Sequence, residues 1–479
     1  MKRMISLLLV LCVLLSLCAC GAAGVDPAPI EGGNAETPGA SAREAGGEDG
    51  QVLARAVYPS MAQRPRQEDY LKENGWEVDG AYFEADQAWR EALAALRDQP
   101  KGYADGLDPW FRSGIRQFLA DAGGENRVFS PLNLTMALAM LSEVTDGETR
   151  RQLLDLLGAE DLEALRETAG SLWLQSYQDD GQTASLLASS LWLRQGTSYE
   201  QQALDNLAAY YYASAFRGEM GSAAYDALLQ SWLNEQTGGL LKEQAAGLHM
   251  EPETVLALAT TIYFKAPWIG EFSPYLTEDG SFFGPDGEEQ VPFLHGSREI
   301  PWYWGERFSA VALDMQNGGE MWFLLPEEGL SPEELLLDEE LMDFLLLRDK
   351  NEWEKQKSPL VRLTIPKFDV SSDLELSAGL RALGLTDAFD PERSDFTPLT
   401  RELEELFVSR VQHAARVKID EEGCEAAAYT VIEVAPGEAC IDEPEPEVID
   451  FILDRPFLFV ITNAGGLPLF VGVVNRPVE

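Results

Sequence analysis

The feature that most constrains the fold is a predicted helix that is apolar on almost every side. Ser130 is a favoured N-cap residue, and Pro131 is a favoured first helical residue. The helix then continues through Met136, Leu138 and Leu141. A surface helix carries a single apolar stripe, so a helix that is apolar nearly all round belongs in the interior. We therefore expect this helix to be buried in the centre of a large domain.

Strand signals follow later in the chain. Residues 254–265 form a long apolar run rich in β-formers, which is typical of a central strand. Near the C-terminus, two apolar runs at 457–462 and 467–474 flank Asn463-Ala464-Gly465-Gly466, a strong hairpin signal. Helices in the first half and strands in the second predict an α+β fold rather than βαβ alternation.

Composition excludes several function classes. The 479 residues include 36 Lys+Arg against 81 Asp+Glu, a formal net charge of −45, with 45% hydrophobic residues. This much apolar material excludes a chain that is disordered throughout. The acidity argues against nucleic-acid binding, which needs clustered basic residues, and against electrostatic docking on anionic membranes. Three His and five Cys leave little for metal sites or His-dependent catalysis, and we expect no cofactor and no metal.

The N-terminus reads as an export signal. Lys2 and Arg3 precede an apolar run from Met4 to Leu17, the length of a signal-peptide core. The run ends in Leu17-Cys18-Ala19-Cys20-Gly21, which resembles the bacterial lipobox, so residues 1–19 would be removed and Cys20 would carry lipid. An ordinary signal peptide with incidental cysteines is the alternative.

A tether and one domain are expected to follow. Residues 20–52 are rich in Gly, Ala, Pro and Glu and read as a flexible linker, and residues 53–479 as the folded domain. Lipid and tether together predict an extracellular domain held at the outer face of a bacterial cytoplasmic membrane by its lipid alone. The remaining Cys424 and Cys440 are expected to be free thiols, because their segment has to move.

The order of several short motifs resembles the serpin family, over roughly Asn126 to Pro477. These motifs are Asn126-Arg127-Val128-Phe129-Ser130-Pro131-Leu132-Asn133, Ser231-Trp232-Leu233-Asn234-Glu235-Gln236-Thr237-Gly238-Gly239, Ile262-Tyr263-Phe264-Lys265-Ala266-Pro267-Trp268, Leu363-Thr364-Ile365-Pro366-Lys367-Phe368, Leu383-Gly384-Leu385-Thr386-Asp387-Ala388-Phe389, Ser394-Asp395-Phe396, Asp454-Arg455-Pro456-Phe457-Leu458-Phe459 and Leu469-Phe470-Val471-Gly472. The resemblance implies three β-sheets, about nine helices and an exposed reactive-centre loop, here at about 421–450. Family inhibitors are suicide substrates, because the cleaved loop inserts into the large sheet and traps the acyl-enzyme.

One segment resembles the hinge of that loop: Glu421, Glu422, Gly423, Cys424, Glu425, Ala426, Ala427, Ala428, Tyr429 and Thr430. Residues of an inserted strand alternate between the two faces of the sheet. The side chains of one alternate set, Cys424, Ala426, Ala428 and Thr430, are small enough to pack on a core. The other set, Glu425, Ala427 and Tyr429, can face outward. No Pro interrupts the hinge, so we predict that it can insert. The alternative is an Ala-rich loop in an inactive relative.

The resemblance also implies a hydrogen-bonded cluster beneath the opening sheet. His413 stands at the place of the family's His, and Ser130 is present. Asn133 replaces a Ser and Thr260 replaces an Asn. We interpret His413 as a structural core residue rather than a catalytic one.

The bait region has no basic residue. Between Val431 and Asp454 there is no Lys or Arg, so trypsin-like proteases are not expected as targets. Family spacing places the scissile bond near Gly437-Glu438, with cuts near Ala435, Ala439 or Cys440 as alternatives. Small residues suit elastase-like or subtilisin-like serine proteases, and a cysteine protease is a possible cross-class target.

These observations lead to two hypotheses. The first is an irreversible inhibitor of extracellular serine proteases. The second is a non-inhibitory serpin-fold lipoprotein that binds a ligand or partner. An enzyme is not expected, because the sequence lacks Gly-x-Ser-x-Gly, His-Glu-x-x-His and a phosphate-binding glycine loop. We expect a monomer. The stretch at 160–167, where some relatives carry a basic helix, is acidic, so no heparin-like cofactor is predicted.

Overall fold

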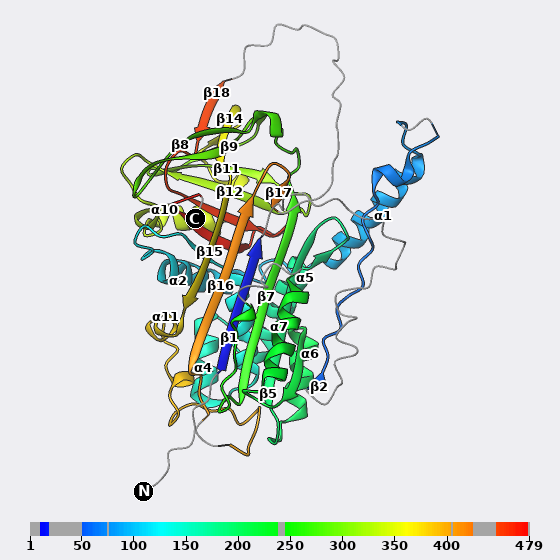
Figure 1. Ribbon diagram of the computed structural model, residues 1–479, viewed down its shortest axis with the longest axis vertical. Helices are drawn as coiled ribbons and strands as arrows, with labels where there is room; N and C mark the ends of the chain where they lie inside the picture. Colours follow the sequence, from blue (N-terminus) through cyan, green and yellow to red (C-terminus); the bar gives the residue numbers. More distant parts are fainter. Residues whose placement is uncertain are drawn as a thin grey trace.

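Three β-sheets organise the chain, and helices pack around them (Figure 1). The computed structural model describes residues 50–73, 76–237, 245–403, 406–424 and 447–477, together with the backbone of residues 10–18. Within these ranges there are ten α-helices. The α+β class and the three sheets are confirmed. The number of helices in these ranges is close to the nine or so that the resemblance implies.

The largest sheet runs along the molecule and carries the candidate site. Its strand order is β15 (Phe368–Glu375), β16 (Arg410–Ile419), β1 (Val10–Cys18), β7 (Leu256–Pro267), β5 (Ala184–Arg194), β6 (Ala213–Gly218) and β2 (Gln51–Ala54). Two short strands lie off this path, because β17 (Gly423–Cys424) pairs with β7 and β4 (Gln178–Asp179) pairs with β5. The predicted central strand is therefore β7, displaced by two residues from the expected 254–265.

The position between β7 and β16 is filled by the N-terminal strand β1. This strand runs parallel to both neighbours, and Leu14 is level with Thr260 on one side and His413 on the other. The run of residues expected to be a cleaved export signal thus forms a central strand in the full chain, because an apolar β-forming segment can pair with two open strand edges. Cleavage stays a prediction. A chain that lacks residues 1–19 would leave β7 and β16 flanking an open strand position.

Two smaller sheets complete the β-structure. The second sheet has the order β13 (Gln356–Lys357), β10 (Trp302–Trp304), β11 (Phe308–Asp314), β12 (Glu320–Pro326), β19 (Phe457–Thr462), β20 (Pro468–Val474) and β3 (Arg127–Phe129). The third has the order β18 (Val448–Ile452), β14 (Leu360–Pro366), β9 (Gly287–Glu299) and β8 (Glu278–Gly284). The predicted C-terminal hairpin is β19–β20.

The apolar helix predicted after Ser130 is α3, and it lies at the centre of the core. The ten helices are α1 (Gly80–Leu96), α2 (Asp108–Leu119), α3 (Pro131–Glu143), α4 (Gly147–Leu156), α5 (Leu162–Ser176), α6 (Gln201–Tyr210), α7 (Ala223–Gln236), α9 (Pro332–Leu335), α10 (Glu339–Leu346) and α11 (Ser377–Ala382). All residues of α3 are buried, and the helix contacts both β7 of the large sheet and β20 of the second sheet. Its position between two sheets explains why it has no polar face.

The other face of the large sheet is covered by α7. A separate apolar cluster joins Trp232 of α7 to Trp192 of β5 and to Ala257 and Ala259 of β7. Ile262 and Phe264 belong instead to the main core. Successive residues of β7 therefore point to opposite sides, toward the main core or toward α7 and solvent.

Candidate reactive loop and sheet-opening site

The start of the predicted hinge is a tight turn between β16 and β17. The backbone N–H of Asp420 donates to the carbonyl of Gly423 at 3.1 Å. The side chain of Asp420 accepts from the N–H groups of Glu422 at 2.9 Å and Gly423 at 3.3 Å. Asp favours this role because its short carboxylate reaches nearby backbone donors. The turn reverses the chain, so that β17 runs antiparallel to β7.

Gly423 is required at this turn for two reasons. Its φ of +156° lies in a region that side chains disfavour. A Cβ at this position would lie 2.6 Å from both the carbonyl oxygen of Ala266 and the Cα of Pro267. Only glycine lets the hinge approach the end of β7 this closely.

Glu421 anchors the turn to the rest of the molecule. Its carboxylate accepts from Lys367 Nζ at 2.7 Å and from Thr277 Oγ1 at 2.8 Å. Burial alone would raise the pKa of Glu421, but the hydrogen bonds from Lys367 and Thr277 outweigh burial and lower it. The carboxylate is therefore held in its charged form at the base of the loop.

Trp268 and Phe272 bind the same turn from the other side. The Trp268 backbone N–H donates to Glu422 O, and its indole N–H donates to Asp420 O, both at 3.0 Å. The Phe272 N–H donates to Glu421 O at 2.8 Å. The described start of the predicted hinge is thus held in place on two sides.

The hinge enters the sheet beside β7, beyond the end of β1. Gly423 pairs with Pro267 and Cys424 with Ala266, while β1 ends where Cys18 pairs with Phe264. Figure 1 shows β17 at the upper ends of β16 and β7, above β1. The described hinge ends at Cys424. The remaining hinge residues 425–430 and the reactive-bond candidates Ala435, Gly437, Glu438, Ala439 and Cys440 lie outside the described residues, as does Cys20.

The predicted sheet-opening cluster comes together in space. The Ser130 backbone N–H donates to His413 Nε2 at 3.1 Å, and Ser130 Oγ donates to Leu469 O at 2.6 Å. Ser130 Oγ also accepts from the Asn133 N–H at 3.2 Å as the helix cap, and Asn133 Nδ2 reaches Thr260 O at 3.5 Å. The four residues link α3 to β7 and β16, the strands that flank the central position.

Two buried polar atoms of this cluster have no hydrogen-bond partner within the described part of the chain, Thr260 Oγ1 and His413 Nδ1. His413 is fully buried, and burial lowers its pKa to about 3, so the ring is neutral at physiological pH. Because Nε2 accepts from Ser130, the ring proton sits on Nδ1. His413 thus presents a donor, and no side chain of the described residues forms a catalytic triad with it. This geometry agrees with a core histidine.

The expectation of a free thiol at Cys424 was wrong. Its sulfur is disulfide-bonded, and the partner cysteine lies outside the described side chains. Cys424 is fully buried at the entrance to the sheet, with its sulfur 3.5 Å from Lys418 O. The prediction assumed that Cys424 moves with the loop. In the structure Cys424 lies in β17, at the fixed start of the hinge.

Sequence reasoning missed the residues that hold the hinge base. Lys367 lies inside the Pro-Lys-Phe motif, but nothing in the sequence pairs it with Glu421, 54 positions away. Thr277 carries no signal of its own. Among the described residues, no helix has the length and apolar character to cross a membrane, and no group of three His, Cys, Asp or Glu is placed to hold a metal ion.

Comparison with known proteins identifies the class. The family profile described as "Serpin (serine protease inhibitor)" matches residues 114–477. Serpin-Z2B of Triticum aestivum is 30% identical over 375 residues, which cover 74% of this chain and 90% of that protein. Serpin-ZXA of Oryza sativa subsp. japonica is 33% identical over 380 residues, covering 75% and 92%. The crystal structure of the thermophilic serpin tengpin in its native state superposes with a TM-score of 0.69 at 23% identity, covering 79% and 95%.

The chain therefore belongs to the serpin family. Members of this family are generally protease inhibitors rather than enzymes. The predicted membership of the serpin family and the predicted fold are confirmed.

Proposed function

We propose that this protein is a suicide-substrate inhibitor of extracellular serine proteases. The protease serine attacks a peptide carbonyl of the loop, the peptide bond breaks, and the new amino terminus leaves while an ester remains. The cleaved loop then enters the large sheet as a strand and carries the protease with it, which traps the ester. The observation that supports this proposal best is the register with which the hinge already enters the sheet.

Continuing that register makes the hinge compatible with a central strand. Since Cys424 pairs with Ala266, an antiparallel continuation places Ala426 opposite Phe264 and Ala428 opposite Ile262. Both β7 residues are fully buried in the main core. Directly opposite residues of an antiparallel pair point to the same face. The alanines would therefore face the core, where only small side chains fit without overpacking.

The opposite face suits the other alternate residues. Glu425 falls opposite Lys265, which gives the carboxylate a cationic neighbour across the strand. Ala427 falls opposite Tyr263, and β1 shows that Tyr263 is level with Arg416 of β16. Tyr263 and Arg416 are both half-buried, so this side of the position tolerates polar groups.

The same register brings Thr430 to the sheet-opening cluster. Thr430 falls opposite Thr260, which is level with His413 across the central position. The hydroxyl of Thr430 can accept from His413 Nδ1 and pair with Thr260 Oγ1, the two groups that have no partner among the described residues before insertion. Satisfying two buried polar groups favours the inserted state.

The target class follows from the loop sequence. No Lys or Arg occurs between Val431 and Asp454, so a protease whose specificity pocket holds a buried acid finds no residue to bind. Small residues near Gly437 fit the shallow pockets of elastase-like or subtilisin-like proteases.

The test is incubation of the chain from Cys20 onward with an elastase-like and a subtilisin-like protease. A protease complex that survives denaturant, together with a large rise in the thermal stability of the cleaved chain, supports inhibition. Running the reaction with and without reductant shows whether the disulfide at Cys424 restrains the loop. Cleavage in the loop without a complex and without a stability gain in either condition would refute the proposal. That result would support the alternative, a non-inhibitory serpin-fold lipoprotein.

We also propose that the protein acts outside the cell, held by lipid on Cys20 at the membrane. The lipobox and the Gly-, Ala- and Pro-rich tether support this proposal. Metabolic labelling with a fatty acid should mark the protein, and Cys20→Ser should abolish the label. Cys18→Ser, two positions earlier, is the matched control and should keep it.

A further inference from the structure

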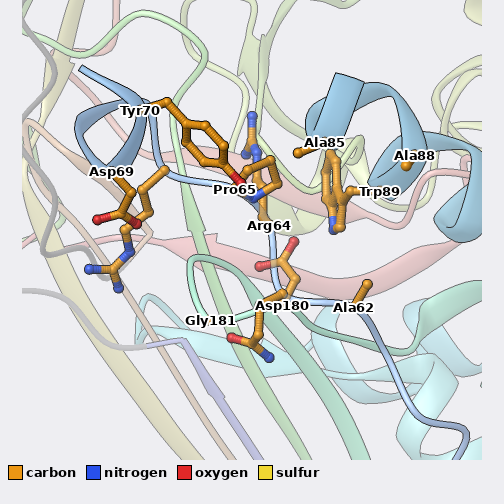
Figure 2. A pocket seen from close by; sticks show the side chains of 12 residues that line it. Ala62, Arg64, Pro65, Asp69, Tyr70, Ala85, Ala88, Trp89, Asp180 and Gly181 are labelled. Atoms are coloured by element: carbon orange, nitrogen blue, oxygen red, sulfur yellow. The ribbon is translucent and has the colours of Figure 1, made fainter. Parts of the chain in front are cut away.

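A cavity lies where the N-terminal extension, which we define as the described residues before residue 114, meets the rest of the molecule. Its volume is about 700 Å³, and its walls come from the segment before α1, from α1 itself and from the turn between β4 and β5 (Figure 2). Apart from that turn, its lining precedes residue 114, where the match to the family begins. The cavity is therefore a property of this chain's own extension, and it is separate from the hinge.

The two sides of the cavity are joined by hydrogen bonds. The Arg64 N–H donates to Asp180 O at 2.9 Å, and Gln182 Nε2 donates to Arg64 O at 3.0 Å. Gly181 has a φ of +82°, and a Cβ there would lie 2.1 Å from Gln63 Oε1. The positive φ therefore favours glycine in this turn, and the two hydrogen bonds hold the extension against it.

Trp89 of α1 forms one wall. The residue is 6% exposed, and the guanidinium of Arg64 lies 4.9 Å from the centre of its ring. Its indole Nε1 has no hydrogen-bond partner among the described residues. Figure 2 shows the indole reaching from α1 into the cavity between Arg64 and Ala62, with its nitrogen edge toward the side of Asp180. A buried donor without a partner is unfavourable unless another molecule supplies an acceptor.

The lining contains two cationic side chains, Arg64 and Arg66, that can bind an anionic ligand. Arg64 Nη1 donates to a neutral partner, Gln316 Oε1, at 2.8 Å. Within the described ranges, neither Arg64 nor Arg66 has a carboxylate within ion-pair distance, although the chain as a whole is strongly acidic.

Two acidic groups also belong to the lining, Asp69 and Asp180. Asp180 is buried, and its carboxylate already accepts from the backbone of Gln182 at 3.0 Å and of Thr183 at 2.8 Å, and from Gln178 Nε2 at 2.6 Å. Asp69 is exposed at the rim. The cavity therefore offers an indole N–H and a guanidinium as donors, with Tyr70 and Pro65 as flat apolar walls.

We infer that this cavity binds a small organic carboxylate with a flat apolar body. The carboxylate accepts from Trp89 Nε1 and from the guanidinium of Arg64, and the apolar body packs against Tyr70 and Pro65. Charge-assisted hydrogen bonds of this kind are short and strong, which favours a carboxylate over a neutral acceptor. A free aromatic acid and the C-terminal carboxylate of a peptide share this chemistry.

The experiment is calorimetric titration of the purified full chain with 3-phenylpropionate and with its neutral amide, 3-phenylpropionamide. We expect saturable binding of the acid and at least about tenfold weaker binding of the amide. N-acetylphenylalanine and its amide form a second pair, and tighter binding of that acid than of 3-phenylpropionate assigns the site to peptide C-termini. In spectra of indole-¹⁵N-labelled protein, the signal of Trp89 should move on addition of the acid.

Two variants test the geometry. Trp89→Phe keeps the ring and removes only the N–H, and it should weaken binding about tenfold. Trp76→Phe, the same change at a residue outside the cavity, should leave affinity unchanged. Arg64→Gln should weaken binding by at least as much as Trp89→Phe, and it provides the test if that variant does not fold. The proposal is overturned if no probe binds saturably, if acid and amide bind equally, or if the variants and the Trp76 control bind alike.

Discussion

Replacement of Ala428 by glutamate should disable trapping while leaving cleavage intact. The register derived from the hinge places Ala428 opposite Ile262, which is 0% exposed, and β1 shows that Ile262 is level with Ala415, which is 2% exposed. A glutamate there would have to enter the apolar core with no cationic partner. In the same register Ala427, one position earlier, would instead lie opposite half-buried Tyr263, which is level with half-buried Arg416.

The free-energy cost of the substitution in the inserted state follows from these apolar surroundings. Burying a charged side chain without a partner costs several kcal/mol, and overpacking adds about 1–3 kcal/mol. A conservative penalty is about 3 kcal/mol on the inserted state. If half of this is felt at the transition state of insertion, insertion slows about tenfold, since each 1.4 kcal/mol is roughly a factor of ten in rate. Hydrolysis of the ester is unchanged, so the number of inhibitor molecules that are cleaved without trapping, per protease trapped, rises about tenfold.

The assay is the stoichiometry of inhibition, measured with a subtilisin-like protease beside gel analysis of complex and cleaved chain. Ala427→Glu is the matched control and should retain nearly the original stoichiometry. The thermal unfolding of the two uncleaved variants should agree with that of the unchanged protein. Equal stoichiometries for Ala428→Glu and Ala427→Glu would refute the register and, with it, the argument that the hinge inserts beside β7.

Three further predictions concern other parts of the site. Gly437→Arg should create a substrate for trypsin-like proteases and, with it, a denaturant-resistant complex with trypsin that the unchanged protein does not form. His413 has its pKa lowered to about 3 by burial, below the value in an unfolded chain, so protonation favours unfolding. The contribution of neutral His413 to the free energy of unfolding should be complete above about pH 6.5, and it should fall by about 1.4 kcal/mol for each pH unit below that value. Urea unfolding at pH 7.5 and 5.5 should therefore show about 1.4 kcal/mol less loss for His413→Asn, and an equal loss would contradict this. Ser130→Ala removes a cap that accepts from Asn133 and a bond to Leu469, and it should lower the free energy of unfolding by about 1–3 kcal/mol, as chemical denaturation would show.

Local sequence patterns predicted the elements that carry the fold. The cap at Ser130 and the apolar helix after it predicted α3, because capping and burial depend on residues within a few positions of one another. The hairpin β19–β20 was predicted for the same reason, since Asn463 to Gly466 form its turn. The alternation of small residues in the hinge likewise follows from the period of a strand.

One expectation shows where such reasoning fails, and a second shows a pattern that has two structural readings. The free thiol assigned to Cys424 rested on the mobility of a loop, but the structure places this residue in the fixed base of the hinge with its sulfur bonded. The apolar run before Cys18 reads as an export signal, yet in the full chain its backbone pairs with β7 and β16. The same apolar β-forming composition fits a membrane signal and a buried strand, so composition does not separate the two.

The sequence by itself determined which segments are helix or strand, which helix must be buried and which hinge residues are small enough to insert. Only the tertiary structure decided what those segments meet. Ser130 and His413 lie 283 positions apart, and Lys367 holds Glu421 across 54. Thr260 and His413 lie at the same height in the large sheet because of the register of its strands. The cavity at Trp89 exists because the extension approaches the turn at Gly181. Propensities and periodicity act over a few residues, whereas register and close approach depend on how distant strands are packed together.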